Sequence, residues 1–230
     1  MALALAEAGA SVALIGRDEA ALEAVKREAI TRGAAEAAWF RADITQEEQV
    51  RAMERRVINQ FGAVHILINN AGINIRKNLE DFALDEWRRV MDSNVTSAFL
   101  VSRSFIPHMR GHGYGRIINL CSIMSHVSLP GRAAYSASKS ALLGMTRSLA
   151  LELTSEGITV VAISPGPFGT EMNTALMQNP EINAQFISKI PVGRWGKVEE
   201  IGSLVRFLCS DGAAFITGTD ILIDGGWCAQ

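Results

Sequence analysis

The segment 116–163 reads RIINLCSIMSHVSLPGRAAYSASKSALLGMTRSLALELTSEGITVVAI. It begins with a short apolar run, Arg116–Leu120, passes through a loop into the long stretch Ala133–Glu156, and ends with a second apolar run, Thr159–Ile163. Short runs that are nearly continuous in Val, Ile and Leu are typical of strands covered on both faces. The segment therefore predicts a strand–helix–strand unit of a parallel sheet.

The same alternation continues in both directions along the chain. Further strands are predicted at Ser11–Ile15, Ala37–Arg41, Val64–Asn69 and Asp220–Ile223. Between them, Thr45 and Glu48 have the spacing of a capping box, Asp85 is a candidate N-cap, and Val198–Ser210 forms another amphipathic stretch. The pattern predicts an α/β fold: a doubly wound, Rossmann-like parallel sheet with helices on both faces.

Bulk composition narrows the class of protein. The 230 residues are 48% hydrophobic with a formal charge of −2, which suits one well-buried domain spanning residues 1–230. The absence of a lysine/arginine run disfavours a nucleic-acid or polybasic membrane partner, and no apolar run approaches the roughly 18 residues of a membrane span. Three cysteines without metal-ligand spacing fit a reducing compartment. We expect a cytoplasmic protein without a metal site.

Tyr135 and Lys139, in the string Y-S-A-S-K, carry the strongest chemical signal. Residues four apart share one face of a helix. An ammonium group beside a phenol favours the phenolate and lowers the pKa of the tyrosine, which suits proton transfer to or from an alcohol oxygen. Such a pair is by itself more often a set of solvated helix residues. It gains weight here from residues at other strand ends.

Several predicted strands end in residues typical of ligand sites. Ser122 follows Arg116–Leu120, Asn69–Gly72 (N-N-A-G) ends another strand, and Pro165–Gly166–Pro167 ends a third. The carboxyl ends of parallel strands share one edge, where open α/β sheets bind ligands. Asn94 lies on an apolar helical stripe, so its buried amide is expected to hold a backbone group or an ordered water.

The motifs of the chain follow one another in the order N-N-A-G, Asn94, Ser122, Tyr135/Lys139, Pro165–Gly166 and a closing D-G-G. With these motifs in this order, the chain resembles the short-chain dehydrogenase/reductase family over essentially its whole length. The resemblance implies that Tyr135 is the catalytic acid/base and that Ser122 hydrogen-bonds the substrate oxygen. It also implies that Lys139 binds the nicotinamide ribose, while Asn94 holds a water in a proton relay. The positions that it assigns to cofactor binding are Asp43, Ile44, Asn70, Ala71, Gly72, Tyr135, Lys139, Pro165, Gly166, Phe168 and Thr170.

One departure from the family pattern concerns the start of the sequence. The family begins with a strand and a glycine-rich turn that holds the pyrophosphate, and no such motif precedes Ser11. The missing strand is the central one in the order 3-2-1-4-5-6, so two hydrophobic strand edges are expected to face each other. This leads us to expect an N-terminally truncated domain that binds a dinucleotide poorly, from either an internal start site or a short product.

The choice between NAD and NADP depends on the residues that follow the predicted strand Ser11–Ile15, which corresponds to the second strand of the family. An acidic residue there would bind the adenosine ribose and disfavour a 2′-phosphate, but the sequence is Ile15–Gly16–Arg17–Asp18. Arg17 can pair with the phosphate, which favours NADP. NAD stays open, because Asp18 can instead cap the next helix and leave Arg17 as a surface charge.

Three segments are informative about the substrate: Gly72–Asn78 (G-I-N-I-R-K-N), the run P-G-P-F-G-T-E-M-N from Pro165, and I-P-V-G-R-W-G around Trp195. They resemble the corresponding segments of gluconate 5-dehydrogenases and related sugar-acid dehydrogenases. Arg76, in the loop after a strand at the active edge, is a candidate for binding a substrate carboxylate, and equally a surface arginine. The segment Met172–Ile190 is predicted to form a lid whose Met172, Met177 and Phe186 face the pocket or simply pack. His126 is a candidate lining residue or an ordinary loop histidine.

The leading prediction is an NAD(P)-dependent oxidoreductase that interconverts a secondary alcohol and a ketone of a sugar acid. The rival within the family is a 3-oxoacyl-carrier-protein reductase, which would need a basic docking patch near Arg76, Lys77, Arg88 and Arg89. From another class, a non-catalytic dinucleotide sensor, a scaffold or an inactive truncated product stays open. The family resemblance also implies a homo-oligomer, commonly a tetramer.

Overall fold

A computed structural model of the chain describes residues 1–170 and 173–230. The strands in these residues are β1 (Val12–Gly16), β2 (Ala37–Arg41), β3 (Ile66–Asn69), β4 (Gly115–Leu120), β5 (Ile158–Pro165) and β6 (Asp220–Ile223). The α-helices are α1 (Ala2–Ala6), α2 (Glu19–Thr31), α3 (Glu47–Phe61), α4 (Leu84–Met91), α5 (Ser97–Met109), α6 (Ala133–Leu153), α7 (Thr174–Gln178), α8 (Pro180–Ser188) and α9 (Val198–Leu208). The predicted strands are all present, with bounds that differ by at most two residues at each end.

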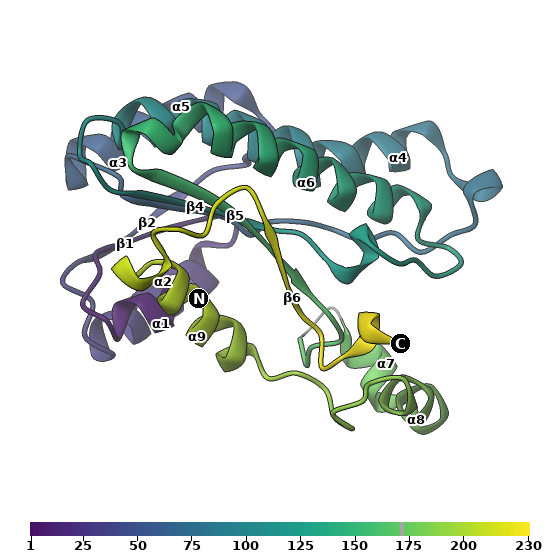
Figure 1. The fold of residues 1–230 in the computed structure, drawn as a ribbon. Coiled ribbons are helices and arrows are strands. Elements are labelled where there is room, and N and C mark those ends of the chain that lie inside the picture. Colours follow the sequence, from purple (N-terminus) through teal and green to yellow (C-terminus); the bar gives the residue numbers. More distant parts are fainter. Residues whose placement is uncertain (171–172) are drawn as a thin grey trace.

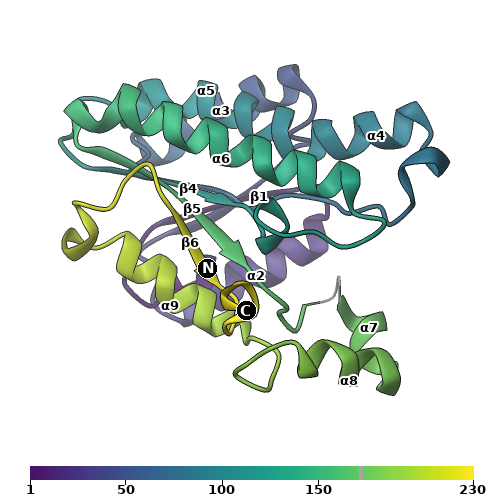
Figure 2. The ribbon, with the colours of Figure 1, turned by 45° about the vertical axis from the view of Figure 1, so that its right-hand side comes forward.

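The strands form a central layer with helices on both faces, as predicted. Figure 1 shows α3, α4, α5 and α6 on one face of the strands and α1, α2 and α9 on the other. The short helices α7 and α8 lie together beyond the sheet, next to the C-terminus, in both views (Figure 2). The doubly wound α/β architecture is therefore confirmed.

All strand pairs are parallel, and they form two hydrogen-bonded sheets. β1 pairs with β2, and the second sheet has the order β3-β4-β5-β6. In a parallel sheet every carboxyl end lies at the same edge, so Asn69, Leu120 and Pro165 end side by side. This edge gathers the loops that follow β3, β4 and β5.

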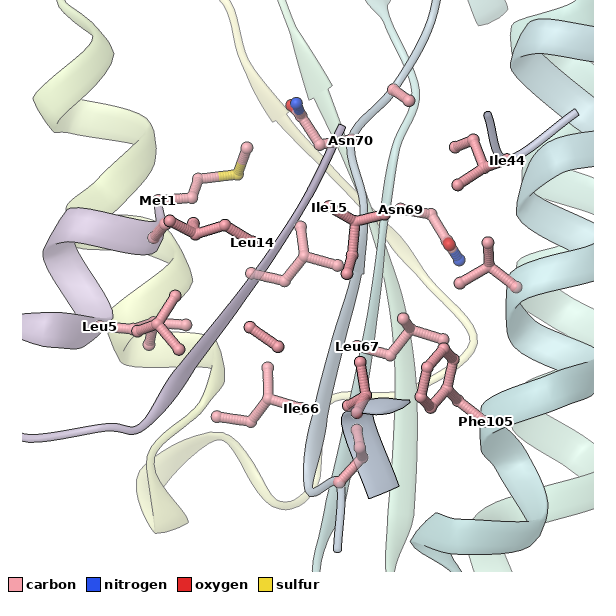
Figure 3. Close-up of a pocket in the computed structure, with 18 of the residues that line it drawn as sticks. Met1, Leu5, Leu14, Ile15, Ile44, Ile66, Leu67, Asn69, Asn70 and Phe105 are labelled. Carbon is pink, nitrogen blue, oxygen red and sulfur yellow. The ribbon is translucent and has the colours of Figure 1, made fainter. Parts of the chain in front are cut away.

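An apolar cavity of about 350 Å³ separates β1 from β3 (Figure 3). Leu14 of β1 and Leu67 of β3 line it from the two sides, together with Phe105 of α5. The two strands are not hydrogen-bonded to each other, so the expected pair of facing hydrophobic edges is present. Neither Ser122 nor Tyr135 lines this cavity. It is therefore a feature of the sheet architecture and separate from the candidate catalytic residues.

The main hydrophobic core lies under α3, α5 and α6. Its fully buried members include Met53, Met109, Ile117, Leu153 and Ile158, each at most 1% exposed. At about 25 cal/mol per Å² of apolar surface, each large side chain here stabilises the fold by roughly 1.5–3 kcal/mol. This packing fixes α6 against β5, which places the residues of α6 relative to the carboxyl edge of the sheet.

Two predicted helix starts are wrong. Thr45 does not cap α3, because its hydroxyl and its backbone N–H both donate to the Asp43 carboxylate, and Gln46 takes the N-cap position. Asp85 lies inside the first turn of α4, whose N-cap is Ala83. Glu86 completes that helix start by accepting a hydrogen bond from the Ala83 N–H at 3.1 Å.

A π-helical segment, Asp92–Thr96, joins α4 to α5 and shifts the helical register. A fixed helical period would place Phe99 on the same side as Trp87, Met91 and Val95, but Phe99 is 46% exposed. The stripe through Val90 and Asn94 is the buried one. Inserted residues of this kind often occur at functional sites.

In the part of the chain that the structure describes, no helix combines the length and the apolar character that a membrane crossing requires.

Candidate active site

Ser122 lies where β4 leaves the sheet. It is buried, and it caps the short 3-10 turn Ile123–Ser125, where its hydroxyl oxygen accepts a hydrogen bond from the Met124 N–H at 3.1 Å. A serine at such a position satisfies the turn and keeps its own O–H free to donate. The turn therefore fixes the Ser122 hydroxyl at the carboxyl edge of the sheet.

Tyr135 and Lys139 lie in the first turns of α6, on the face that meets the same edge. The Lys139 side chain is buried, and its Nζ donates to the Leu120 carbonyl oxygen at 2.6 Å. Nζ lies 5.8 Å from the centre of the Tyr135 ring. The end of β4 thus anchors Lys139 beside the tyrosine.

The expected effect of Lys139 on Tyr135 is not what the structure shows. Burial raises the pKa of Tyr135, while hydrogen bonding to Ser122 and the charge of Arg132 act in the opposite direction. Burial also lowers the pKa of Lys139 to about 8. The reason for the discrepancy is that the ammonium points at a backbone carbonyl instead of the phenol.

Asn94 holds a backbone group, which was one of the two expected partners. Its Oδ1 accepts from the Ile73 N–H at 2.7 Å, and its Nδ2 donates to the Ile73 carbonyl oxygen at 3.0 Å. Nδ2 also donates to the Ser138 hydroxyl at 2.9 Å. One buried amide therefore ties the loop after β3 to the helix that carries Tyr135.

Gly72 allows these groups to approach the loop backbone closely. A Cβ atom at this position would lie 3.1 Å from Asn94 Oδ1 and 3.3 Å from Lys139 Nζ, which is tighter than ordinary van der Waals contact. The two side chains are thus brought together across Gly72. This proximity is compatible with the relay from Asn94 to Lys139 that the family resemblance implies.

The predicted cofactor residues and the predicted catalytic residues Ser122, Tyr135 and Lys139 line two cavities that share Asn70, Gly72 and Thr170, whereas Asn94 lines neither. The first, of about 260 Å³, holds Ser122, Tyr135 and Lys139. It also takes in the following predicted cofactor residues: Asn70, Gly72, Pro165, Gly166, Phe168 and Thr170. The second, of about 750 Å³, is lined by Arg17, Asp43, Ile44, Asn70, Ala71, Gly72 and Thr170. The structure therefore brings every predicted cofactor residue to one continuous groove.

Other candidates lie outside the catalytic cavity. Arg76 is exposed and does not line it. His126 is exposed and hydrogen-bonds Asp220, so it is a loop histidine here. Phe186 lines the cavity, where it stacks on Trp195 with 5.4 Å between ring centres, whereas Met177 does not. Met172 lies outside the described residues.

Polar lining residues that had no predicted role include Asn74, Arg132 and Asn173. Arg132 and Asn74 both line the catalytic cavity. The sequence carried a signal for Arg132, since it precedes Tyr135 by three residues, and helix residues three apart lie on the same face. Asn74 gave no such signal, because the path of the loop after β3 is not periodic.

Within residues 1–170 and 173–230, no group of three or more His, Cys, Asp or Glu side chains is arranged to hold a metal ion. The polar groups of the groove are amides, hydroxyls, the Cys121 thiol, the Asp43 carboxylate, Lys139 and the arginines Arg17 and Arg132. The amides, hydroxyls and cations among them can donate to an organic ligand with anionic and hydroxyl groups.

Comparison with known proteins identifies relatives along the whole chain. A family model described as enoyl-(acyl carrier protein) reductase matches residues 1–228. Gluconate 5-dehydrogenase of Gluconobacter oxydans (strain 621H) is 35% identical over 227 residues, which cover 98% of this chain and 88% of the relative. A 3-oxoacyl-[acyl-carrier-protein] reductase of Staphylococcus aureus is 39% identical over 228 residues, covering 98% and 91%.

A solved structure shows the same fold. The gluconate 5-dehydrogenase from Burkholderia cenocepacia J2315, crystallised in complex with NADP and tartrate, matches with a TM-score of 0.94 and 34% identity. The match covers all of this chain and 90% of the other. The relatives thus include an enzyme acting on a sugar acid and one acting on an acyl thioester.

Proposed function

The chain belongs to the short-chain dehydrogenase/reductase family of oxidoreductases, and from this membership we propose that it interconverts a secondary alcohol and a ketone of a sugar acid with NADP. The observation that carries the proposal is the meeting of Ser122, Tyr135 and Lys139 in one cavity that continues into the cofactor groove. Such a convergence of polar groups at the edge of a parallel sheet supports a catalytic site.

Proton handling at the substrate oxygen falls to Tyr135 and Ser122. In the oxidation direction, the Tyr135 oxygen takes the proton of the substrate alcohol. The Ser122 hydroxyl donates a hydrogen bond to the substrate oxygen. The Arg132 charge lowers the pKa of Tyr135 and so helps against the effect of burial. Lys139, anchored on the Leu120 carbonyl, keeps a donor at the inner end of the cavity.

The groove offers side chains for the nicotinamide and adenine halves of a dinucleotide. Gly72 lines both cavities, and the absence of a Cβ there lets Asn94 and Lys139 lie against the loop backbone. Lys139 and Thr170 would hold the nicotinamide half, and Asp43 and Ile44 the adenine. When bound, the nicotinamide accepts or donates the hydride.

NADP is favoured over NAD by the residues at the end of β1. Asp18 caps α2 by accepting a hydrogen bond from the Ala21 N–H at 3.0 Å, so its carboxylate is engaged there. Arg17 lines the adenine half of the groove, and its side chain is 75% exposed, with only a 3.8 Å contact to Asp43. Its guanidinium is thereby left able to bind a 2′-phosphate.

Arg17→Ala is expected to raise the Kd for NADPH by about 3–30-fold, the range for a charge-assisted contact screened by water. The Kd for NADH should stay within about twofold, because NADH lacks the phosphate. Fluorescence titration of both cofactors measures the effect. Arg41→Ala is the matched control, since Arg41 is a neighbouring exposed arginine paired with Glu19 at 3.5 Å. An unchanged NADPH affinity in Arg17→Ala would refute the phosphate contact.

The sugar-acid assignment rests on the relatives and on the polar lining. Asn74, Ser122, Arg132 and Tyr135 surround a cavity of about 260 Å³, which suits a small hydroxylated molecule. Phe186 and Trp195 also line it. The cavity thus combines a few polar groups with aromatic rings, as is usual for small-molecule sites.

The second candidate, a 3-oxoacyl-carrier-protein reductase, is supported by the identity to the Staphylococcus aureus enzyme. Its expected basic docking patch is weak in the structure. Lys77 pairs with Glu86 at 2.6 Å, and Arg88 contacts Asp85 at 3.4 Å. Two of the four cations that were to attract an acidic carrier are therefore largely neutralised.

A substrate panel tests the proposed function. With NADP, the protein is expected to oxidise gluconate with a kcat/KM at least about tenfold above that for the neutral polyol glucitol. The reverse reaction with NADPH should use the corresponding keto acid in preference to acetoacetyl thioesters. The change in NADPH absorbance measures both directions. Faster reduction of the thioester than of the keto acid would reverse the choice between the two candidates.

A further inference from the structure

Arg132 lies at the entrance to α6 in a position to touch a bound substrate. It is the N-cap residue of that helix, three positions before Tyr135, and both side chains line the catalytic cavity. Residues three apart on a helix share a face, so the guanidinium and the phenol open onto the same space. Arg132 is only partly exposed.

The chain's other sequestered arginine, Arg116, shows how the fold satisfies a guanidinium. Arg116 is 3% exposed and donates to the backbone carbonyls of Gly115, Leu208 and Ser210. Arg132 has no hydrogen-bond or ion-pair partner among the residues described by the structure. A guanidinium withdrawn from water without a partner is costly, and a bound anion would compensate for that cost.

The surroundings of Arg132 favour an anion. Burial lowers the pKa of Arg132, and the charge of Arg76 lowers it further, while Tyr135 acts in the opposite direction. The charges of Arg132 and Arg76 add to a positive potential that attracts negative ligands. Arg76 itself is exposed and outside the cavity, so it contributes to the field without lining the site.

Asn74 adds a second unmatched group to the same cavity. Its Oδ1 is buried and has no hydrogen-bond donor in the part of the chain that the structure describes. Buried amide oxygens are nearly always paired, either with protein groups or with bound molecules. A hydroxyl group is a suitable donor, because it can rotate to meet the oxygen.

We propose that Arg132 binds the carboxylate of a polyhydroxy acid substrate and that Asn74 accepts a hydrogen bond from one of its hydroxyl groups. Together with Ser122 and Tyr135 at the reacting oxygen, these contacts would hold the substrate at three points. The inference rests on the proposed sugar-acid function and refines it. It transfers the carboxylate contact from Arg76, where the sequence suggested it, to Arg132.

Matched substrates and variants of the full chain test the two roles separately. Arg132→Gln should raise the KM for gluconate by about 10–100-fold and leave the KM for glucitol within about threefold, since only the acid carries the anion. The KM of Arg132→Lys for gluconate should lie between the values for the wild type and for Arg132→Gln.

Asn74→Leu should raise the KM for both compounds by a similar factor of about 3–10, because both carry the hydroxyl. Arg147→Gln, at an exposed arginine farther along α6, is the control.

Three results would overturn the assignment to Arg132. These are an equal rise in KM for gluconate and glucitol in Arg132→Gln, an unchanged KM for gluconate, or a larger rise in Arg76→Gln than in Arg132→Gln. An effect of Asn74→Leu on one substrate alone would overturn the role of Asn74.

A binding measurement separates this inference from the proposed function. The thermal shift that gluconate produces in the NADPH-loaded protein is read without turnover. A shift that is present in the wild-type chain and lost in Arg132→Gln, with no oxidation of gluconate, would reject the function and keep the acid site. Absence of any shift and of any turnover with gluconate or its keto acid would reject both.

Discussion

Tyr135→Phe is expected to lower kcat by about 10²–10⁴-fold in both reaction directions, the range for loss of a positioned proton donor or acceptor. The substitution keeps the ring in the cavity and removes only the phenolic oxygen. Cofactor affinity should change by less than about threefold, because the ring packing and Lys139 stay in place. Steady-state rates and NADPH titration of the same preparation measure the two effects.

Tyr114→Phe is the matched control, since Tyr114 is the chain's only other tyrosine. Its hydroxyl donates to the Cys209 carbonyl oxygen at 2.6 Å, away from the catalytic cavity. Losing that hydrogen bond should cost about 1 kcal/mol of stability and leave kcat unchanged. If Tyr135→Phe kept more than about a tenth of the wild-type kcat, Tyr135 would not be the proton-transfer group.

The groups around Tyr135 determine how readily its phenol loses a proton. Because burial raises the pKa of Tyr135, the phenolate that oxidation needs must be favoured by nearby donors and charges. Ser122 and Arg132 are the groups that lower this pKa in the structure. The residue that holds the substrate in our further inference thus also adjusts the group that moves the proton.

The sheet was predictable because buried parallel strands have nearly continuous apolar sequences. Ala37–Arg41 and Asp220–Ile223 were predicted with the bounds that the structure has. The edge at which β3, β4 and β5 end then followed from parallel pairing alone. This is why Ser122 and Asn70 could be assigned to one site before any coordinates.

Local helix geometry was less predictable, because it depends on competition between nearby groups. Thr45 and Glu48 have the spacing of a capping box, yet the Asp43 carboxylate takes both donors of Thr45. The π-helical segment before α5 adds a residue to the turn, which a reading with a fixed period of 3.6 residues cannot register. The exposure of Phe99 follows from that shift.

Electrostatic details of the site needed three-dimensional information. Sequence spacing places Lys139 beside Tyr135, but it does not reveal that Lys139 donates to the Leu120 carbonyl. Burial dominates the pKa values of both groups, and burial is a property of the packed fold. The spacing of Arg132 to Tyr135 was a usable signal in the sequence, but the partial burial of Arg132 in the catalytic cavity is visible only in the fold.

Asn94→Ala is expected to reduce the free energy of unfolding by about 2–4 kcal/mol. The side chain is 1% exposed, and its removal leaves the N–H and carbonyl of Ile73 without their partner inside the fold. For a chain of this length the loss corresponds to a fall in Tm of about 5–15 °C. Asn59→Ala, at an exposed helical asparagine, should change stability by less than about 0.5 kcal/mol.

Function should fall together with stability in Asn94→Ala, because Asn94 joins two parts of the groove. The Ile73 backbone belongs to the loop that carries Gly72, and Ser138 precedes Lys139 on α6. Freed from Asn94, the loop can shift against α6, which should weaken NADPH binding measured well below the Tm of the variant. A double-mutant cycle with Ser138→Ala should give a coupling energy of about 0.5–3 kcal/mol. Additive losses, with NADPH affinity intact, would mean that Asn94 only supports the helix and does not align the cofactor loop with Tyr135.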